Sequence, residues 1–172
     1  MRFATIPNYL CLNDKSLTVG LFRAVGMGVC SAALLVLVSS LLFALLGRAN
    51  MGSLAAKAVF ERGWIATCFA AIIWAPLWET LIGQLIPFSL LSWFGAPRSI
   101  AVFGSAALFS AGHMASGGGV GQGMVTFVGG LLFASLFAAN ADAGLSRASL
   151  LTATAHATNN ALLVLLSFGF DF

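Results

Sequence analysis

The hydropathy of the chain alternates between long apolar runs and short polar or glycine-rich connections. A membrane-spanning helix needs about 20 predominantly apolar residues. Five stretches approach or exceed this length, and we expect a helix in each of them: residues 17–46, 64–86, 99–114, 124–139 and 148–168. The pattern therefore predicts an all-α, polytopic transmembrane helix bundle with about five to six membrane-embedded helices and a site inside the bundle.

The segments between these runs are short or polar. Residues 1–16 predict a polar N-terminal arm, and residues 53–62 predict an amphipathic segment at the membrane interface. Residues 88–94 are apolar but too short to span, and prolines lie on both sides of them. We interpret them as an interfacial or re-entrant piece, with an extension of the preceding helix as the alternative. The first run, residues 17–46, is expected to be structural and peripheral.

The composition indicates an integral membrane protein. The chain is 60% hydrophobic and 8% charged with a mean hydropathy of +1.00, whereas soluble domains carry about 25% charged residues. Its 172 residues leave room for one membrane domain, in which residues 64–168 form the expected functional core. Membrane lipid is therefore an expected partner. Lysine and arginine form no cluster, which argues against nucleic acid as a partner; the oligomeric state is open.

The basic residues give an expected orientation. With five spans, five of them fall on the N-terminal side and three on the other: Arg2, Lys15, Arg23, Arg98 and Arg147 against Arg48, Lys57 and Arg62. Basic residues are enriched on the cytoplasmic side, so we expect a cytoplasmic N-terminus. The expected compartment is a bacterial inner membrane.

Three isolated ionisable residues lie in three separate apolar runs. Glu79 is one of only five acidic residues, and His113 and His156 are the only two histidines. A charged side chain at the centre of a membrane helix costs about 2.5–3.5 kcal/mol on insertion scales. Such residues face the bundle interior and pair with one another, so we expect these three to mark a functional site.

Other residues extend this candidate site. Thr152, His156 and Asn160 follow at i, i+4 and i+8, which places them on one face of a helix. Pro76 lies in the interior of the second run and predicts a kink beside the carboxylate. Gly129 and Gly130 predict a close approach between helices.

The three ionisable residues form a general acid/base set. A carboxylate and imidazoles in a partly dry cavity can activate water, and the Asn160 amide can donate to a developing oxyanion. Water-mediated hydrolysis of an amide suits this set, because the sequence shows no nucleophile elbow. Glu79, His113 and His156 can also supply three zinc ligands. We expect no metal, because a ligating Glu79 would leave no second acid to serve as the base.

The same residues suit two other classes of protein. A buried acid can relay protons or cations in a transporter, and intramembrane histidine or asparagine residues often form interhelical hydrogen bonds worth about 0.6 kcal/mol. Phe109, Trp74 and Trp78 are interpreted as packing residues. The residues alone leave catalysis, transport and structural roles open.

The order of these residues resembles the CPBP intramembrane protease family, the CAAX-processing and bacteriocin-processing group. The family motifs Phe-x-x-x-His and His-x-x-x-Asn are met by Phe109 with His113 and by His156 with Asn160. The resemblance covers residues 64–168.

The first family motif, Glu-Glu-x-x-x-Arg, is met in part. Glu79 occupies its first position, whereas Thr80 and Gln84 stand where the family has its second glutamate and its arginine. An alanine-proline pair commonly precedes the motif, and this chain has Ala75 and Pro76 there.

The resemblance implies an intramembrane endopeptidase that acts on a peptide or protein substrate, with or without an attached lipid. In that scheme Glu79 and His113 activate the attacking water, and His156 and Asn160 stabilise the oxyanion. Four residues would support them: Thr80, Gln84, Phe109 and Thr152. The family is often labelled metalloprotease, and zinc, if used, would lie on Glu79, His113 and His156. A non-catalytic immunity or assembly protein with the same fold is the alternative.

Overall fold

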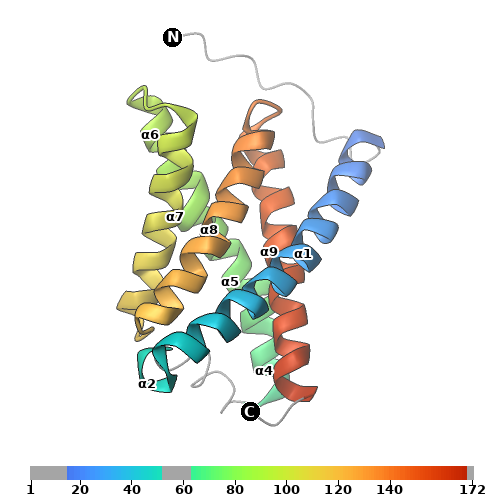
Figure 1. Cartoon of the computed structure of the whole chain (residues 1–172). Coiled ribbons are helices and arrows are strands. Elements are labelled where there is room, and N and C mark those ends of the chain that lie inside the picture. The colour runs from blue at the N-terminus through green and yellow to red at the C-terminus, as the bar shows by residue number, and fades with distance from the viewer. Residues whose placement is uncertain (1–14, 52–62, 170–172) are drawn as a thin grey trace.

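The computed structural model describes residues 15–51 and 63–169, and every regular element in these ranges is a helix (Figure 1). The expectation of an all-α bundle is confirmed. Nearly all of the predicted N-terminal arm and of the predicted interfacial segment lies outside the described residues. The elements are α1 (Lys15–Leu46), α2 (Arg48–Met51), α4 (Trp64–Cys68), η1 (Phe69–Trp74), α5 (Ala75–Thr80), η2 (Leu81–Leu85), α6 (Ile86–Trp93), α7 (Arg98–Ala115), α8 (Val120–Ala141) and α9 (Leu145–Gly169).

The elements from α4 to α6 form one continuous helical rod from Trp64 to Trp93, 30 residues long. The rod alternates between α-helical segments and two π-helical ones, η1 and η2. Because residues 88–93 continue the rod within α6, the interpretation of residues 88–94 as a separate interfacial or re-entrant piece is wrong.

The two π-helical segments explain why Pro76 and Pro87 do not end the rod. The N–H of Ala75 donates to the carbonyl of Ala70, five residues back. The N–H of Ile86, just before Pro87, donates to the carbonyl of Leu81, also five residues back. A proline has no N–H, and its ring crowds the carbonyl four residues earlier. The wider π-helical turn relieves this crowding, so a wide turn stands next to Glu79 where the sequence predicted a kink.

Several helices are long and apolar enough to cross a membrane, as expected for an integral membrane protein. By length and composition, three of the described helices meet this standard: Leu17–Leu46, Trp64–Trp93 and Val120–Ala141. Their outward faces carry large apolar side chains, with Phe22 75% exposed and Ile65 83% exposed. Apolar surface of this extent is stable in contact with lipid tails and unfavourable in water.

The helices pack closely where side chains are small. In Figure 1, α7, α8 and α9 follow one another across the bundle, and α1 crosses in front of α8 and α9. A Cβ added to Gly130 would lie 3.0 Å from the Cα of Ala106 in α7, and one added to Gly129 would lie 3.1 Å from Leu35 in α1. The close approach predicted at these two glycines is confirmed.

Two apolar clusters hold the bundle together. One joins α1, α8 and α9, and the other joins α6, α7, α8 and α9. Their buried members are Leu17, Ala24, Phe133, Leu151 and Ala155 in the first, and Phe88, Ala101, Phe137, Ala138 and Ala148 in the second. Since α1 contributes to the first cluster and packs along α9, it has one inward face, whereas most of its large apolar side chains are exposed, as predicted for a peripheral helix.

Candidate active site

Glu79 lies between the two histidines. Its Oε2 atom is 3.3 Å from Nε2 of His156 and 3.9 Å from Nε2 of His113. The three side chains come from α5, α7 and α9, which meet because α9 packs on α5 and α7 packs on the adjoining η2. Within the described chain, these imidazoles are the ion-pair partners of the carboxylate. The structure thus brings together the three ionisable residues that the sequence shows in separate runs.

Exposure falls from one side of this cluster to the other. The side chains of Glu79 and His113 are 31% and 25% exposed, whereas that of His156 is 4% exposed. The carboxylate and His113 are therefore partly exposed, while His156 is the buried member of the cluster.

His113 is held in one orientation by its own helix. It lies in the last turn of α7, and its Nδ1 is 3.0 Å from the carbonyl oxygen of Phe109, one turn earlier. A carbonyl only accepts hydrogen bonds, so Nδ1 carries the hydrogen and donates it. In the neutral ring, Nε2 then has a free lone pair, and this atom faces Glu79. The Phe109 ring lies against the imidazole, with 4.6 Å between the ring centroids.

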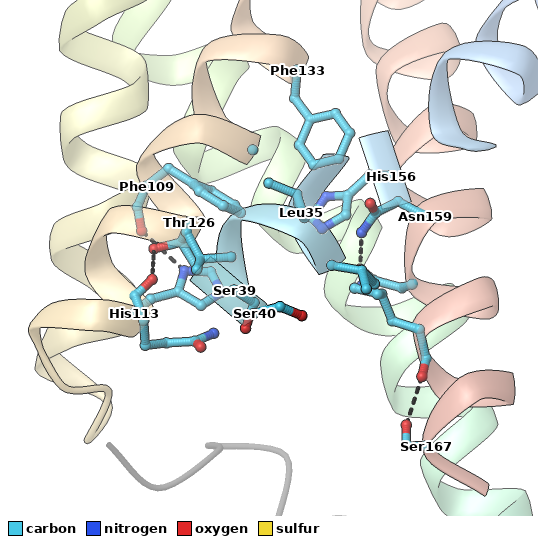
Figure 2. A pocket seen from close by; sticks show the side chains of 16 residues that line it. Leu35, Ser39, Ser40, Phe109, His113, Thr126, Phe133, His156, Asn159 and Ser167 are labelled. Atoms are coloured by element: carbon cyan, nitrogen blue, oxygen red, sulfur yellow. Dashed lines mark hydrogen bonds between the residues drawn. The ribbon is translucent and has the colours of Figure 1, made fainter. Parts of the chain in front are cut away.

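His156 is fixed by aromatic packing. Its ring stacks on Phe133 of α8 with 4.5 Å between centroids and meets the edge of Phe109 at 5.8 Å. Figure 2 shows these rings at the wall of the cavity. Phe109 thus contacts both histidines, which agrees with its interpretation as a packing residue. Nδ1 of His156 is buried and has no hydrogen-bond partner among the described residues.

Asn160 uses its amide to bind the neighbouring helical rod. Its Nδ2 donates to the carbonyl oxygen of Ala71 at 2.9 Å. This carbonyl lacks a donor of its own, because the N–H of Ala75 goes to Ala70 and residue 76 is a proline. Asn160 therefore supplies the hydrogen bond that Pro76 removes. The oxyanion role that the sequence suggested for Asn160 would rest on its second N–H.

Asn159 is a polar residue of this region that the sequence analysis did not single out. It is 2% exposed, its Oδ1 accepts a hydrogen bond from the Ser31 hydroxyl of α1, and its Nδ2 donates to Oδ1 of Asn160. The three side chains link α1 through α9 to the rod. The signal in the sequence is the pair of adjacent asparagines in an apolar run.

The predicted supporting residues other than Phe109 are buried without partners. Thr80, Gln84 and Thr152 are 2%, 0% and 0% exposed, and within the described chain their side-chain polar atoms make no hydrogen bond. By contrast, Trp74 and Trp78 lie on the outer surface, 55% and 43% exposed, with their rings in contact at 5.7 Å. The tryptophans therefore pack against each other, away from the histidines.

A cavity of roughly 350 Å³ opens beside the histidines. Its lining includes His113, His156 and Asn160, and α1 contributes Ser39 and Ser40. Figure 2 shows the two serines among the residues that line the cavity. Residues of α1 therefore line the candidate site, although the sequence analysis placed the functional core in residues 64–168.

The described residues include no group of three or more histidine, cysteine, aspartate or glutamate side chains arranged to hold a metal ion.

Comparison with known proteins gives no relative. No family model, curated protein or solved structure matches the chain.

Proposed function

We propose that this protein is an intramembrane peptide hydrolase in which Glu79 and His113 activate water. One observation carries the proposal: the Glu79 carboxylate lies between two imidazoles, and both imidazoles line a cavity in an otherwise apolar bundle. Acid/base groups at such spacing suit general-base catalysis. The resemblance of the three motifs to the CPBP family points to the same reaction.

The water position follows from the acceptors around it. Glu79 Oε2 and His113 Nε2 are 3.9 Å apart, too far for a direct hydrogen bond. A water molecule beside them can donate one hydrogen to the carboxylate and the other to the lone pair of His113. Its oxygen lone pairs then point away from both groups, toward the carbonyl of a bound peptide.

The proposed reaction balances with these groups. The water oxygen bonds to the peptide carbonyl carbon while Glu79 takes the water proton, and the carbonyl oxygen becomes an oxyanion. Once protonated, Glu79 accepts a weaker hydrogen bond from the Nε2–H of His156, which can then donate to an oxyanion that forms beside it. The C–N bond then breaks, and the Glu79 proton passes to the leaving amine. Asn160 positions α9 against the rod and has a second N–H for the oxyanion.

The cavity suggests an extended substrate segment. Its lining combines aliphatic and aromatic residues with serine, threonine and amide side chains, which suits a peptide backbone with apolar side chains or an attached lipid. We propose a membrane-associated peptide or protein substrate, five or six membrane-embedded helices, and a cytoplasmic N-terminus in a bacterial inner membrane.

The test is cleavage by the purified protein in liposomes that carry a library of membrane-anchored peptides, read by mass spectrometry of new chain ends. We expect wild type to produce new ends, and Glu79→Gln and His113→Ala to produce none. Leu37→Ala is the matched control, because Leu37 is 68% exposed on the outer surface of α1. Cleavage by Glu79→Gln at the wild-type rate would overturn the proposal.

The second candidate is a non-catalytic membrane protein, such as an immunity or assembly factor or a small proton-coupled transporter. The observation in its favour is the structural use of Ser31, Asn159 and Asn160 in hydrogen bonds between helices. In this case Glu79→Ala would preserve the biological role and lower stability. Proton flux through liposomes that depends on Glu79, without cleavage, would indicate transport.

A further inference from the structure

Four buried polar groups on the rod and on α9 make no hydrogen bond to any of the described residues. They are the Thr80 hydroxyl, both amide atoms of Gln84, the Thr152 hydroxyl and Nδ1 of His156. Each of the four residues is at most 3% exposed. Buried polar groups are nearly always hydrogen-bonded to protein or ordered water, and leaving one unpaired costs about 1–3 kcal/mol. Four such groups together need a common explanation.

The antiparallel packing of the rod and α9 places these groups at one level. Ala71 meets Asn160, and Glu79 meets His156 further along the rod. One more turn in the same direction reaches Gln84 on the rod and Thr152 on α9. Thr152 and His156 share a face of α9 at i, i+4, and Thr80 and Gln84 have the same spacing on the rod.

The two sides of this region have different character. On one side the imidazole of His156 separates it from Glu79 and the cavity. On the other side the second apolar cluster, which includes Phe88 and Ala148, covers the end of the interface between the rod and α9. The polar groups therefore form a closed site inside the bundle.

We propose that Thr80, Gln84 and Thr152 hold ordered water against Nδ1 of His156. A small set of neutral donors and acceptors in a closed site suits water, which makes about three hydrogen bonds in such places. Charged ligands do not suit it, because the described side chains that we assign to this site beside His156 (Thr80, Gln84 and Thr152) are all neutral.

The water site fixes the tautomer of His156, and the use of this tautomer in catalysis rests on the proposed function. When Nε2 carries the hydrogen and faces Glu79, the lone pair of Nδ1 accepts a hydrogen from the water. Hydroxyl, amide and water groups can serve as donors and acceptors, so Thr80, Gln84 and Thr152 can complete the hydrogen bonds of this water. The imidazole is then uncharged in the apolar core, with its Nε2–H available to the oxyanion. Thr80, Gln84 and Thr152 are thus positioning residues for His156.

The experiment is solid-state NMR of the ¹⁵N-histidine-labelled protein in lipid bilayers. The chain has only two histidines, so a His113→Ala sample assigns the signals of His156. We expect a cross-peak between Nδ1 of His156 and water protons, its loss in the double variant Gln84→Leu/Thr152→Val, and its retention in Thr152→Ser. Thr154→Val is the matched control, since that hydroxyl donates to the Leu150 carbonyl of its own helix.

Absence of the water cross-peak in folded wild type would overturn the water site, and so would its persistence in the double variant. If the double variant does not fold, loss of the cross-peak in Thr152→Val and its retention in Thr152→Ser test the same point. The outcome is independent of hydrolysis. If the protein shows the cross-peak but cleaves no peptide, the water site is supported and the proposed function is refuted.

Discussion

Glu79 and His156 meet across two antiparallel helices, with Oε2 of one 3.3 Å from Nε2 of the other. The rod contributes the carboxylate from the segment between its two π-helical turns, and α9 contributes the imidazole from its buried face. At this distance a small movement completes a charge-assisted hydrogen bond. The geometry of the pair depends on the length of the glutamate side chain and on the register of α9.

Glu79→Asp tests how the pair depends on the length of the glutamate side chain. Loss of one methylene group withdraws the carboxylate from both imidazoles by about 1.5 Å, the length of a carbon–carbon bond. A misplacement of about 1 Å can lower a rate on the order of 100-fold. We expect turnover of a cleaved reporter peptide to fall by roughly that factor, with the thermal unfolding midpoint close to that of wild type. Wild-type turnover in Glu79→Asp would mean that the position of the carboxylate does not matter.

The register of α9 depends on the hydrogen bond between Asn160 and Ala71. A double-mutant cycle with Pro76 tests whether Asn160 compensates for the backbone hydrogen bond that the proline removes. Asn160→Ala leaves the Ala71 carbonyl unpaired, and we expect it to lower the free energy of unfolding in a bilayer by about 1 kcal/mol. Pro76→Ala restores a backbone N–H, so the rod can satisfy Ala71 without Asn160.

In the Pro76→Ala background, we therefore expect Asn160→Ala to change the free energy of unfolding by less than half of its effect in the wild-type protein. Additive effects of the two substitutions would show that Asn160 does not compensate for the proline. Thr158→Ala provides the control, because the Thr158 hydroxyl donates to Thr154 within α9.

The sequence predicts most of the fold because apolar length and glycine placement act locally. The described helix boundaries lie close to the ends of the apolar runs. The extension of the rod through Pro87 is the alternative interpretation of residues 88–94 and not the favoured one, because proline normally ends a helix unless the preceding turn widens. A π-helical turn leaves no clear mark in hydropathy, since it changes one hydrogen-bond register and no residue type.

The candidate site is predictable only in part, for a related reason. Rare ionisable residues in apolar runs must be paired, which is why Glu79, His113 and His156 stand out. The acceptor of the Asn160 side-chain N–H depends on the π-helical hydrogen bonds of the rod. The hydrogen bond of Ser31 depends on where α1 crosses α9. Both are properties of tertiary packing, which spacing along one helix does not reveal.

Gly130 tests the packing that holds α7 against α8. An added Cβ lies 3.0 Å from the Cα of Ala106, a backbone atom that can move only with its helix. We expect Gly130→Ala to lower the free energy of unfolding by about 1–3 kcal/mol through overpacking. Gly26 in α1 has no atom within 4 Å of the corresponding position, so Gly26→Ala should be neutral or stabilising by up to about 1 kcal/mol. Equal effects of the two substitutions would contradict a tight contact between α7 and α8.

The participation of α1 in the site is tested by filling the cavity from its side. Ser39 lines the cavity together with the histidines, and a tryptophan there occupies a large part of its roughly 350 Å³. We expect Ser39→Trp to raise KM for a reporter peptide at least several-fold with little change in the unfolding midpoint. Leu37→Trp, on the 68% exposed outer face, should leave KM unchanged. An unchanged KM in Ser39→Trp would mean that the substrate does not enter the cavity.

The last prediction concerns metal. If Glu79 and the two histidines held zinc, the carboxylate oxygen would be a ligand and the described interior of the bundle would retain no second acid to act as base, because Thr80 follows Glu79. In the proposed reaction Glu79 is itself the base, so we expect activity to survive dialysis against a chelator. Elemental analysis of the purified protein should find zinc far below one ion per chain. His113→Ala distinguishes the two cases further. Under the proposed function it loses activity without a change in metal content, whereas in a zinc enzyme activity and zinc are lost together. Stoichiometric zinc that is removed by the chelator with loss of activity, and that restores activity when added back, would show that this assignment of Glu79 is wrong.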